Sequence, residues 1–406
     1  MPIVLFVSAS VLLFCSYAYS YLWSIQIIPV TPAVMFVVTI VAGLLLALFR
    51  YGFVLPPPKF RHLIYWVATF LLLSSLSVAF AGFGEQANQH LTHYFQGALM
   101  LVVFAMLFRS SWIVNAGIKA LVAVVLFGST LNILEFFGIL KDITLISGRS
   151  AGFYENPNLS AFYLTLGFCT SALFVPKRFR TAYAVAVFLG VFVTFSRSGI
   201  LICGLMIGYL GFVGAFALSR IQSTIITASV ALALVLAFTS GSLVDFLGKS
   251  AVEEYMSEDA TNRISIDKQQ DSSVAGRASA ALAGVELFME NPLLGIGVGG
   301  AIGLDEGMNT HNVYVQSAVE MGFLGLFLIF WLMFIVFKCG THESNMFLLA
   351  FFVWGFFNHN ILDQPAFFIM LALAAAVSTR HSTDYPPFVR RFLQVYWREP
   401  GASKGK

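Results

Sequence analysis

The feature that most constrains this chain is a series of apolar runs, most close to 20 residues long, separated by short polar segments. A run of about 20 residues forms a helix that crosses a hydrocarbon core of about 30 Å. Only 11% of the residues are charged, whereas soluble domains have roughly 25%. A spanning segment must pair its own backbone groups, and the runs lack the alternating polarity of barrel strands. The sequence therefore predicts an all-α, polytopic transmembrane helix bundle.

The runs predict about twelve spans, interrupted by one large polar loop. Spans one to nine are expected within residues 1–239, a large extracytoplasmic loop with amphipathic helices at 240–311, the last spans at 312–380 and a basic tail at 381–406. The four cysteines lie in or beside apolar runs without CxxC spacing, so neither a disulfide framework nor a metal site is expected. The predicted spans lie near 2–22, 31–50, 61–82, 92–108, 114–136, 158–175, 182–195, 198–218, 223–240, 312–338, 345–360 and 364–379.

Basic residues are distributed unevenly between alternate connections. With the N-terminus in the cytoplasm, the cytoplasmic connections and the C-terminal tail hold 15 of the 23 Lys and Arg residues. Lys and Arg are enriched in cytoplasmic loops of membrane proteins. This bias predicts a multi-pass protein whose termini are both cytoplasmic and whose 240–311 loop faces outward.

Three arginines on the predicted outer side, Arg149, Arg197 and Arg277, run against this bias. An ionised group at a membrane boundary is costly and is a functional hypothesis by default, although snorkelling to lipid headgroups explains any one of them. Each lies among Gly, Ser or Asn residues, which favours a shared anionic ligand. Arginine suits a diphosphate because its planar fork donates paired hydrogen bonds and stays charged.

Each arginine lies beside a predicted helix start. Arg149 precedes Asn156-Pro157-Asn158, which is expected to start a helix near Leu159 with Asn158 as its cap, and such an N-terminus suits phosphate. A capped turn without a ligand is the alternative reading. Arg277 is expected at the N-terminal end of an amphipathic helix, 278–290, on the membrane surface. Ser196 and Ser198 flank Arg197 and are expected to cap a helix or add donors.

His311 opens the tenth predicted span, in the sequence His311-Asn312-Val313-Tyr314. Imidazole titrates near neutrality, so His311 is a candidate general base for a sugar hydroxyl. An interfacial, structural histidine is the alternative. His359 is the other outward candidate, in a polar turn that is expected to be structural, whereas His90 and His93 have no arginine motif beside them.

The chain has no Walker loop, no Rossmann fingerprint and no acidic metal pair in an outer loop. Neither a nucleotide nor a metal ion is therefore expected as a cofactor. The energy for any reaction must come with the substrate. A lipid diphosphate carries such energy, because diphosphate leaves as a stable anion when cations neutralise its developing charge.

Taken in order, the motifs resemble those of the O-antigen ligase and O-antigen polymerase superfamily of membrane glycosyltransferases. The resemblance covers most of the chain and implies metal-independent transfer of a glycan from undecaprenyl diphosphate, on the periplasmic side of a bacterial inner membrane. By position, Arg197 and Arg277 match the arginines that contact the diphosphate, and His311 matches the base. The resembling segments are Arg149 to Asn158, Ser196 to Gly199, Gly276 to Gly297 and His311 to Gly325.

The spacing is most similar to the ligase, which attaches the glycan to lipid A–core. No nucleic-acid partner is expected, and both substrates are embedded in the lipid bilayer. A polymerase extending a glycan on the same lipid shares nearly all of the pattern, while Glu155 and Glu320 remain alternative nucleophiles or bases. A transporter of lipid-linked sugars would need charges along its span interiors, which are nearly free of them, and a non-catalytic assembly protein would not need His311. The residues expected to contact substrate are Arg149, Asn158, Ser196, Ser198, Asn312, Tyr314 and Glu320.

Overall fold

The computed structural model describes residues 1–52, 56–57, 60–81, 84–140, 149–154, 156–216, 272–301 and 310–377, with the backbone alone for residues 81 and 272–278. The described residues form helices and no strands, which confirms the all-α prediction. The predicted span at 223–240, most of the 240–311 loop, Glu155 and the basic tail lie outside the described residues.

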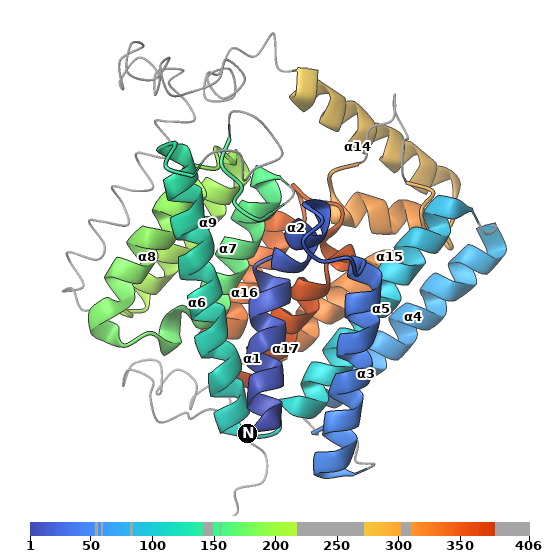
Figure 1. The fold of residues 1–406 in the computed structure, drawn as a ribbon. Coiled ribbons are helices and arrows are strands. Elements are labelled where there is room, and N and C mark those ends of the chain that lie inside the picture. Colours follow the sequence, from blue (N-terminus) through green and yellow to red (C-terminus); the bar gives the residue numbers. More distant parts are fainter. Residues whose placement is uncertain are drawn as a thin grey trace, which may run out of the picture.

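Helices occupy every predicted span within the described residues (Figure 1). Of these helices, α3, α4, α5, α6 and α15 are long and apolar enough to cross a membrane, and α1 with α2 counts as a further span if the bent pair is taken as one. These are the features of a multi-pass membrane protein. The N-terminal helices are α1 (Pro2–Cys15), α2 (Ala18–Ser24), α3 (Pro32–Tyr51), α4 (Arg61–Ala81), α5 (Glu85–Leu107), α6 (Ser111–Phe136), α7 (Pro157–Ser171), η2 (Ala172–Phe174), α8 (Lys177–Phe192) and α9 (Arg197–Phe212). The C-terminal helices are α14 (Ser272–Glu290), α15 (Val313–Lys338), α16 (His342–Trp354), η3 (Ile361–Asp363) and α17 (Pro365–Val377).

Two short helices, α7 and α17, form the centre of the bundle. Every residue of α17 is buried, and so is every residue of α7 except Asn158 in its first turn. α17 packs against α1, α5, α6, α7 and α16, so neighbouring helices surround it. A helix that is apolar on all sides belongs in a core, whereas α3 exposes Val34, Val37, Val38 and Val41 on the outside of the bundle. The outer helices therefore present apolar side chains to the surroundings, as a lipid environment requires.

The first predicted span is bent, because α1 and α2 meet at an angle of 61°. The bend lies at Tyr17, whose φ of 62° is left-handed. Tyr154, from the loop before α7, donates its hydroxyl hydrogen to the Cys15 carbonyl at 3.0 Å. This bond satisfies a carbonyl at the end of α1, where no helical partner is available.

The two ends of the bundle differ in charge. Four helices carry a basic residue at one terminus. Arg50 lies in the last turn of α3, and Lys338 is the last residue of α15. Arg61 and Lys177 are the first residues of α4 and α8. Because the helices alternate in direction, these residues share one end, at which the N-terminus also lies. α14 lies across the other end of the bundle (Figure 1). The candidate functional residues belong to that second end.

Candidate functional site

Arg149 is buried and connects two of the predicted motifs. Its Nε donates to the Thr194 carbonyl at 3.0 Å, and its Nη2 donates to Asn158 Oδ1 at 3.4 Å. Thr194 lies two residues before Ser196, so the first arginine motif is in contact with the second. The loop that follows Arg149 is fixed to the end of α6, since Glu135 accepts from the backbone N–H of residues 151 and 152 at 3.0 Å.

The predicted cap of α7 was wrong. The helix begins at Pro157, and Asn156 caps it by accepting from the Leu159 N–H at 2.9 Å. Proline favours the first helical position, because the N–H it lacks would have no helical partner there. Asn158 therefore lies inside the first turn, where its amide oxygen accepts from Arg149.

The second arginine motif forms the start of α9. Ser196 caps the helix by accepting from the Gly199 N–H at 3.4 Å, and the hydroxyls of Ser196 and Ser198 are 3.5 Å apart. Arg197 is the first helical residue and is half-buried. The preceding Phe195 has a φ of 51°, which turns the chain sharply between α8 and α9. A helix N-terminus carrying an arginine is a favourable place for an anion.

The third arginine, Arg277, lies within α14 rather than at its N-terminal end, because the helix already begins at Ser272. α14 packs on α15 through small side chains: a Cβ added at Gly284 would come within 2.6 Å of Val315. Phe288 packs edge-on against Phe323, with ring centroids 5.1 Å apart. The exposed residues of α14 include the apolar Leu282, Val285 and Met289 and the acidic Glu286 and Glu290. This arrangement is consistent with the predicted helix at a membrane surface.

His311 lies directly beside His359, with ring centroids 5.2 Å apart and the rings nearly perpendicular. The sequence had identified both residues but had not placed them together. His311 has a φ of 49°, an uncommon conformation for a residue other than glycine. The polar turn at 357–364, expected to be structural, therefore contributes a side chain to the surroundings of the proposed base.

Asn312 and Tyr314 hold the backbone on either side of this histidine contact. Asn312 caps α15 by accepting from the N–H of Tyr314 and Val315, at 2.9 and 3.2 Å. Tyr314 donates its hydroxyl hydrogen to the Phe352 carbonyl at 2.8 Å, and the Val313 N–H donates to the Gly355 carbonyl at 2.9 Å. The Tyr314 hydroxyl and the Val313 N–H thus join the start of α15 to the end of α16, while Asn312 caps α15 itself. We interpret them as residues that position His311.

Burial, together with electrostatic repulsion from nearby His311 and His90, lowers the pKa of His359 to about 3. Within the described residues, His359 Nδ1 is buried and has no hydrogen-bond partner. His359 is therefore neutral at physiological pH. His359 therefore adds no positive charge beside His311 at that pH.

Replacement of His359 by glutamine is expected to reduce the acid sensitivity of the fold. The unfolded chain protonates this imidazole near pH 6.5 while the folded chain resists protonation until about pH 3. The unfolded state thus binds more protons in this window, and the stability of the wild type falls as the pH drops from 6.5 toward 3. The test is the midpoint of thermal unfolding in detergent at pH 7 and pH 5, with His62→Gln, at an exposed histidine, as the control. A midpoint that falls equally in all three proteins would contradict this assignment.

His90 and Asp363 form a second pair near this end of the bundle. His90 Nδ1 is 3.2 Å from each carboxylate oxygen of Asp363, which joins α5 to η3. Gln364, the next residue, accepts from the Tyr163 hydroxyl of α7 at 2.8 Å. The sequence analysis set His90 aside because no arginine motif lies beside it; the available signal was the polar stretch at the start of an otherwise apolar span. In the described ranges, no His, Cys, Asp and Glu side chains form a group of three or more that could hold a metal ion.

Glu320 is buried in a network of protein donors. Its Oε1 accepts from the Gly299 N–H and the Gln316 amide, at 3.1 and 3.0 Å, and its Oε2 accepts from the Tyr94 hydroxyl at 3.1 Å. The side chain is 1% exposed. We interpret Glu320 as a residue that joins α5, α15 and the glycine-rich segment, which places it behind the site rather than on its surface.

The glycine-rich segment at 291–300 pairs with a break in α15. Gly322 departs from helical geometry, with φ 61° and ψ −147°. The carbonyls freed at Val319 and Glu320 accept from the N–H of Ile296 and Gly297, at 2.8 and 3.1 Å, and the Phe323 N–H donates to the Pro292 carbonyl at 2.8 Å. Two motifs that resembled the superfamily are therefore one structural unit, which we call the glycine latch (residues 291–300 and 319–323).

Residues 182–330 match the family model described as O-antigen ligase. This match confirms the predicted superfamily. The matched segment covers less than half of the chain and includes Arg197, Arg277 and His311. Arg149, His90 and His359 lie outside the matched segment of the O-antigen ligase family. No curated protein matches the chain.

Proposed function

We propose that this protein is an O-antigen ligase, a membrane glycosyltransferase that transfers a glycan from undecaprenyl diphosphate to lipid A–core without a metal ion. The observation that carries this proposal is the assembly of the motifs at one end of the bundle. Arg149 contacts the turn that precedes Arg197, and His311 contacts His359. The O-antigen ligase family match supports the same reading.

In the proposed reaction, a hydroxyl oxygen of lipid A–core attacks the anomeric carbon of the donor glycan. The bond from that carbon to the diphosphate oxygen breaks, and its electron pair leaves with the undecaprenyl diphosphate. The imidazole of His311 takes the proton of the attacking hydroxyl. Arg197 and Arg277 stabilise the additional negative charge on the departing diphosphate, and Arg149 holds the turn that carries Arg197.

The orientation of the molecule follows from its unequal ends. The described basic residues Arg50, Arg61, Lys177 and Lys338 share the end at which the N-terminus lies, and Lys and Arg are enriched on the cytoplasmic side. We therefore propose that the end bearing Arg197 and His311 faces the periplasm of a bacterial inner membrane. Both reacting lipids reach this site from the bilayer, and α14 covers it through contact with α15.

The test of this proposal is transfer by the purified protein in liposomes. Synthetic undecaprenyl-diphosphate-linked glycan is supplied either with lipid A–core or with a second lipid-linked repeat. Attachment to lipid A–core is expected. A ladder on the carrier lipid would identify a polymerase, and movement of intact lipid-linked sugar across the bilayer without transfer would identify a transporter.

Replacement of Arg197 by glutamine is expected to lower the rate of transfer about 100- to 1,000-fold, the usual effect of losing one donor to a developing anion. The matched control is Arg50→Gln, which removes an exposed arginine from a helix end on the other side of the bundle. Initial rates of both variants are compared with that of the wild type at saturating donor. Equal rates for the two variants would remove Arg197 from the proposed diphosphate site.

A further inference from the structure

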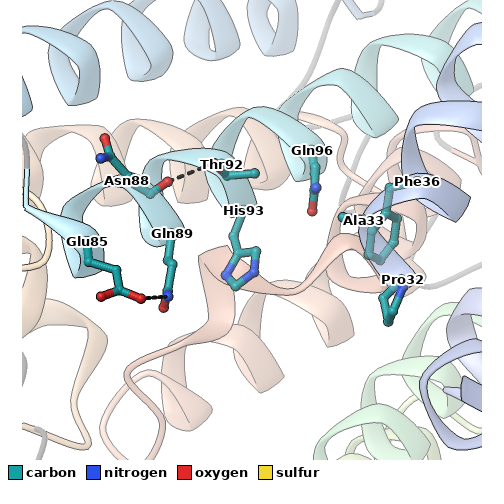
Figure 2. A pocket seen from close by; sticks show the side chains of 9 residues that line it. All are labelled: Pro32, Ala33, Phe36, Glu85, Asn88, Gln89, Thr92, His93 and Gln96. Atoms are coloured by element: carbon teal, nitrogen blue, oxygen red, sulfur yellow. Dashed lines mark hydrogen bonds between the residues drawn. The ribbon is translucent and has the colours of Figure 1, made fainter. Parts of the chain in front are cut away.

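A polar pocket of about 580 Å³ lies outside the site described above, between the start of α3 and the first half of α5 (Figure 2). On the α3 side its wall consists of Pro32, Ala33 and Phe36. The volume falls within the range of small-ligand sites. On the α5 side its lining is polar: Glu85, Asn88, Gln89, Thr92, His93 and Gln96.

The polar lining extends far along a helix that is expected to cross the membrane. At 1.5 Å per residue, Glu85 and Gln96 are separated by about 16 Å along the axis of α5. The adjacent surface of α3 exposes Val34, Val37 and Val38. Polar groups beside an apolar environment are costly unless they are hydrogen-bonded. The other polar lining residues of α5 are exposed, so this requirement applies to the buried Gln96.

Gln96 shows this need. Its side chain is 8% exposed, and no hydrogen bond joins its amide to another described side chain or backbone group. Figure 2 shows the amide of Gln96 pointing to the same side of α5 as the ring of His93, toward the space beside Ala33 and Phe36. A buried amide without partners lacks up to four hydrogen bonds. A ligand in the pocket can supply them.

The chemistry of the lining favours a neutral, hydroxyl-rich ligand. The described residues that line the pocket include no Lys or Arg, and Glu85 gives it a carboxylate, so this lining does not suit a phosphate. Amides, a carboxylate and a threonine hydroxyl donate and accept hydrogen bonds at short intervals, as sugar hydroxyls do. The apolar wall of Phe36 and Pro32 suits the C–H face of a sugar ring.

The pocket adjoins the candidate functional site through α5. The ring of His93 in the pocket is 6.4 Å from the ring of His90, which pairs with Asp363 beside the 357–364 turn. Tyr94, the next residue on α5, holds Glu320. One helix thus presents its polar stripe to the pocket and its other polar residues to the site.

We propose that this pocket binds saccharide units of the lipid-linked substrates, separately from the diphosphate. The inference rests on the proposed glycosyltransferase function. Both donor and acceptor carry sugars, and the experiment distinguishes them by which substrate is affected. The pocket then places the saccharide on one face of α5 while the reacting hydroxyl or anomeric carbon extends toward His311.

The test is a pair of matched tryptophan substitutions, Thr92→Trp and Thr130→Trp. Both threonines are exposed and donate to the carbonyl four residues earlier, at 2.7 and 2.8 Å, but only Thr92 lines the pocket. Thr92→Trp fills the pocket and is expected to raise the KM of one substrate about tenfold or more, with a smaller change in kcat. Gln96→Leu, which keeps the volume and removes the amide, is expected to raise the same KM about two- to tenfold. Thr130→Trp is expected to match the wild type.

Unchanged KM values for donor and acceptor in Gln96→Leu and Thr92→Trp, with an active wild type, would overturn the proposal. If Thr92→Trp does not fold, Gln96→Leu and Thr92→Val give the answer. An inactive wild type would contradict the proposed function instead. Saturation-transfer NMR with the saccharide released from the carrier lipid then tests the pocket directly, and signals equal in the wild type and Gln96→Leu would overturn the proposal.

Discussion

Replacement of His311 by alanine is expected to lower the rate of glycan transfer about 100- to 10,000-fold, the usual contribution of a general base. Its imidazole lies at the start of α15, where the Asn312 cap fixes the backbone, and its ring contacts that of His359. The pKa of His359 is about 3, so this neighbour is neutral at pH 7 and does not add a charge beside the base. The assay is initial-rate transfer to lipid A–core in liposomes.

The controls for His311→Ala separate chemistry from folding and binding. His342→Ala changes a histidine at the first residue of α16, at the opposite end of the bundle, and is expected to leave the rate within a few-fold of the wild type. The dissociation constant for the lipid-linked donor is expected to be similar in His311→Ala and the wild type. Full activity in His311→Ala would exclude the base assignment and direct attention to His359, Glu155 and Glu320.

Replacement of Gly322 by alanine is expected to be the most destabilising of the substitutions considered. Its φ of 61° and ψ of −147° are accessible to glycine and strained for other residues, at a cost of about 1–3 kcal/mol. A Cβ at this position would also lie 2.5 Å from the backbone carbon and oxygen of Leu293 and from the Pro292 oxygen. Backbone atoms held in the glycine latch cannot give way as a flexible side chain can. The latch must therefore separate for the variant to fold.

A second glycine with a positive φ, just beyond the end of the same helix, provides a control. Gly340 has a φ of 68° just after α15, and a Cβ there would have the Lys338 oxygen at 4.0 Å as its neighbour. Gly340→Ala places a side chain at a positive φ without the clash. The measurement is the half-life at raised temperature in detergent, which suits a protein that unfolds irreversibly. Half-lives that fall equally in both variants would show that the contact with residues 292–293 contributes nothing.

Gly322→Ala is also expected to lower activity, because the latch holds Glu320. The Gly299 N–H, on one side of the latch, donates to the Glu320 carboxylate, which also accepts from Tyr94 of α5. α5 carries both the polar pocket and His90, which pairs with Asp363. Disturbing the latch thus reaches the proposed saccharide pocket and the turn that holds His359. A variant with a shorter half-life and unchanged KM and kcat would show that the latch serves stability alone.

The spans were the most predictable part of this protein. Lipid requires each crossing segment to be long, apolar and internally hydrogen-bonded, so the solvent itself imposes a local pattern. α3, α4 and α6 occupy nearly the ranges that the apolar runs predicted. The break at 195–198 was also readable, since Ser196 caps α9 where the apolar runs are interrupted. Local chemistry decides such features, and local chemistry is visible in a sequence.

Contacts between distant residues were not predictable in the same way. The sequence placed His359 in a structural turn and set His90 aside, yet His359 contacts His311 and His90 pairs with Asp363, which is 273 residues away. The sequence identified Gly295 and Gly322 as motif residues but did not explain why glycine is required at these positions. Their reason is a backbone contact between two segments, which no period or composition encodes.

The sequence by itself determined that the chain is an all-α membrane protein, where most helices lie, and which family its arginine and histidine motifs resemble. The tertiary structure alone decided that Arg149 contacts the Thr194 turn, that Glu320 is buried among protein donors, and that one face of α5 lines a pocket. The physical reason is the range of the interactions. Burial in lipid acts on each segment separately, whereas hydrogen bonds and side-chain packing join groups that the folded bundle brings together.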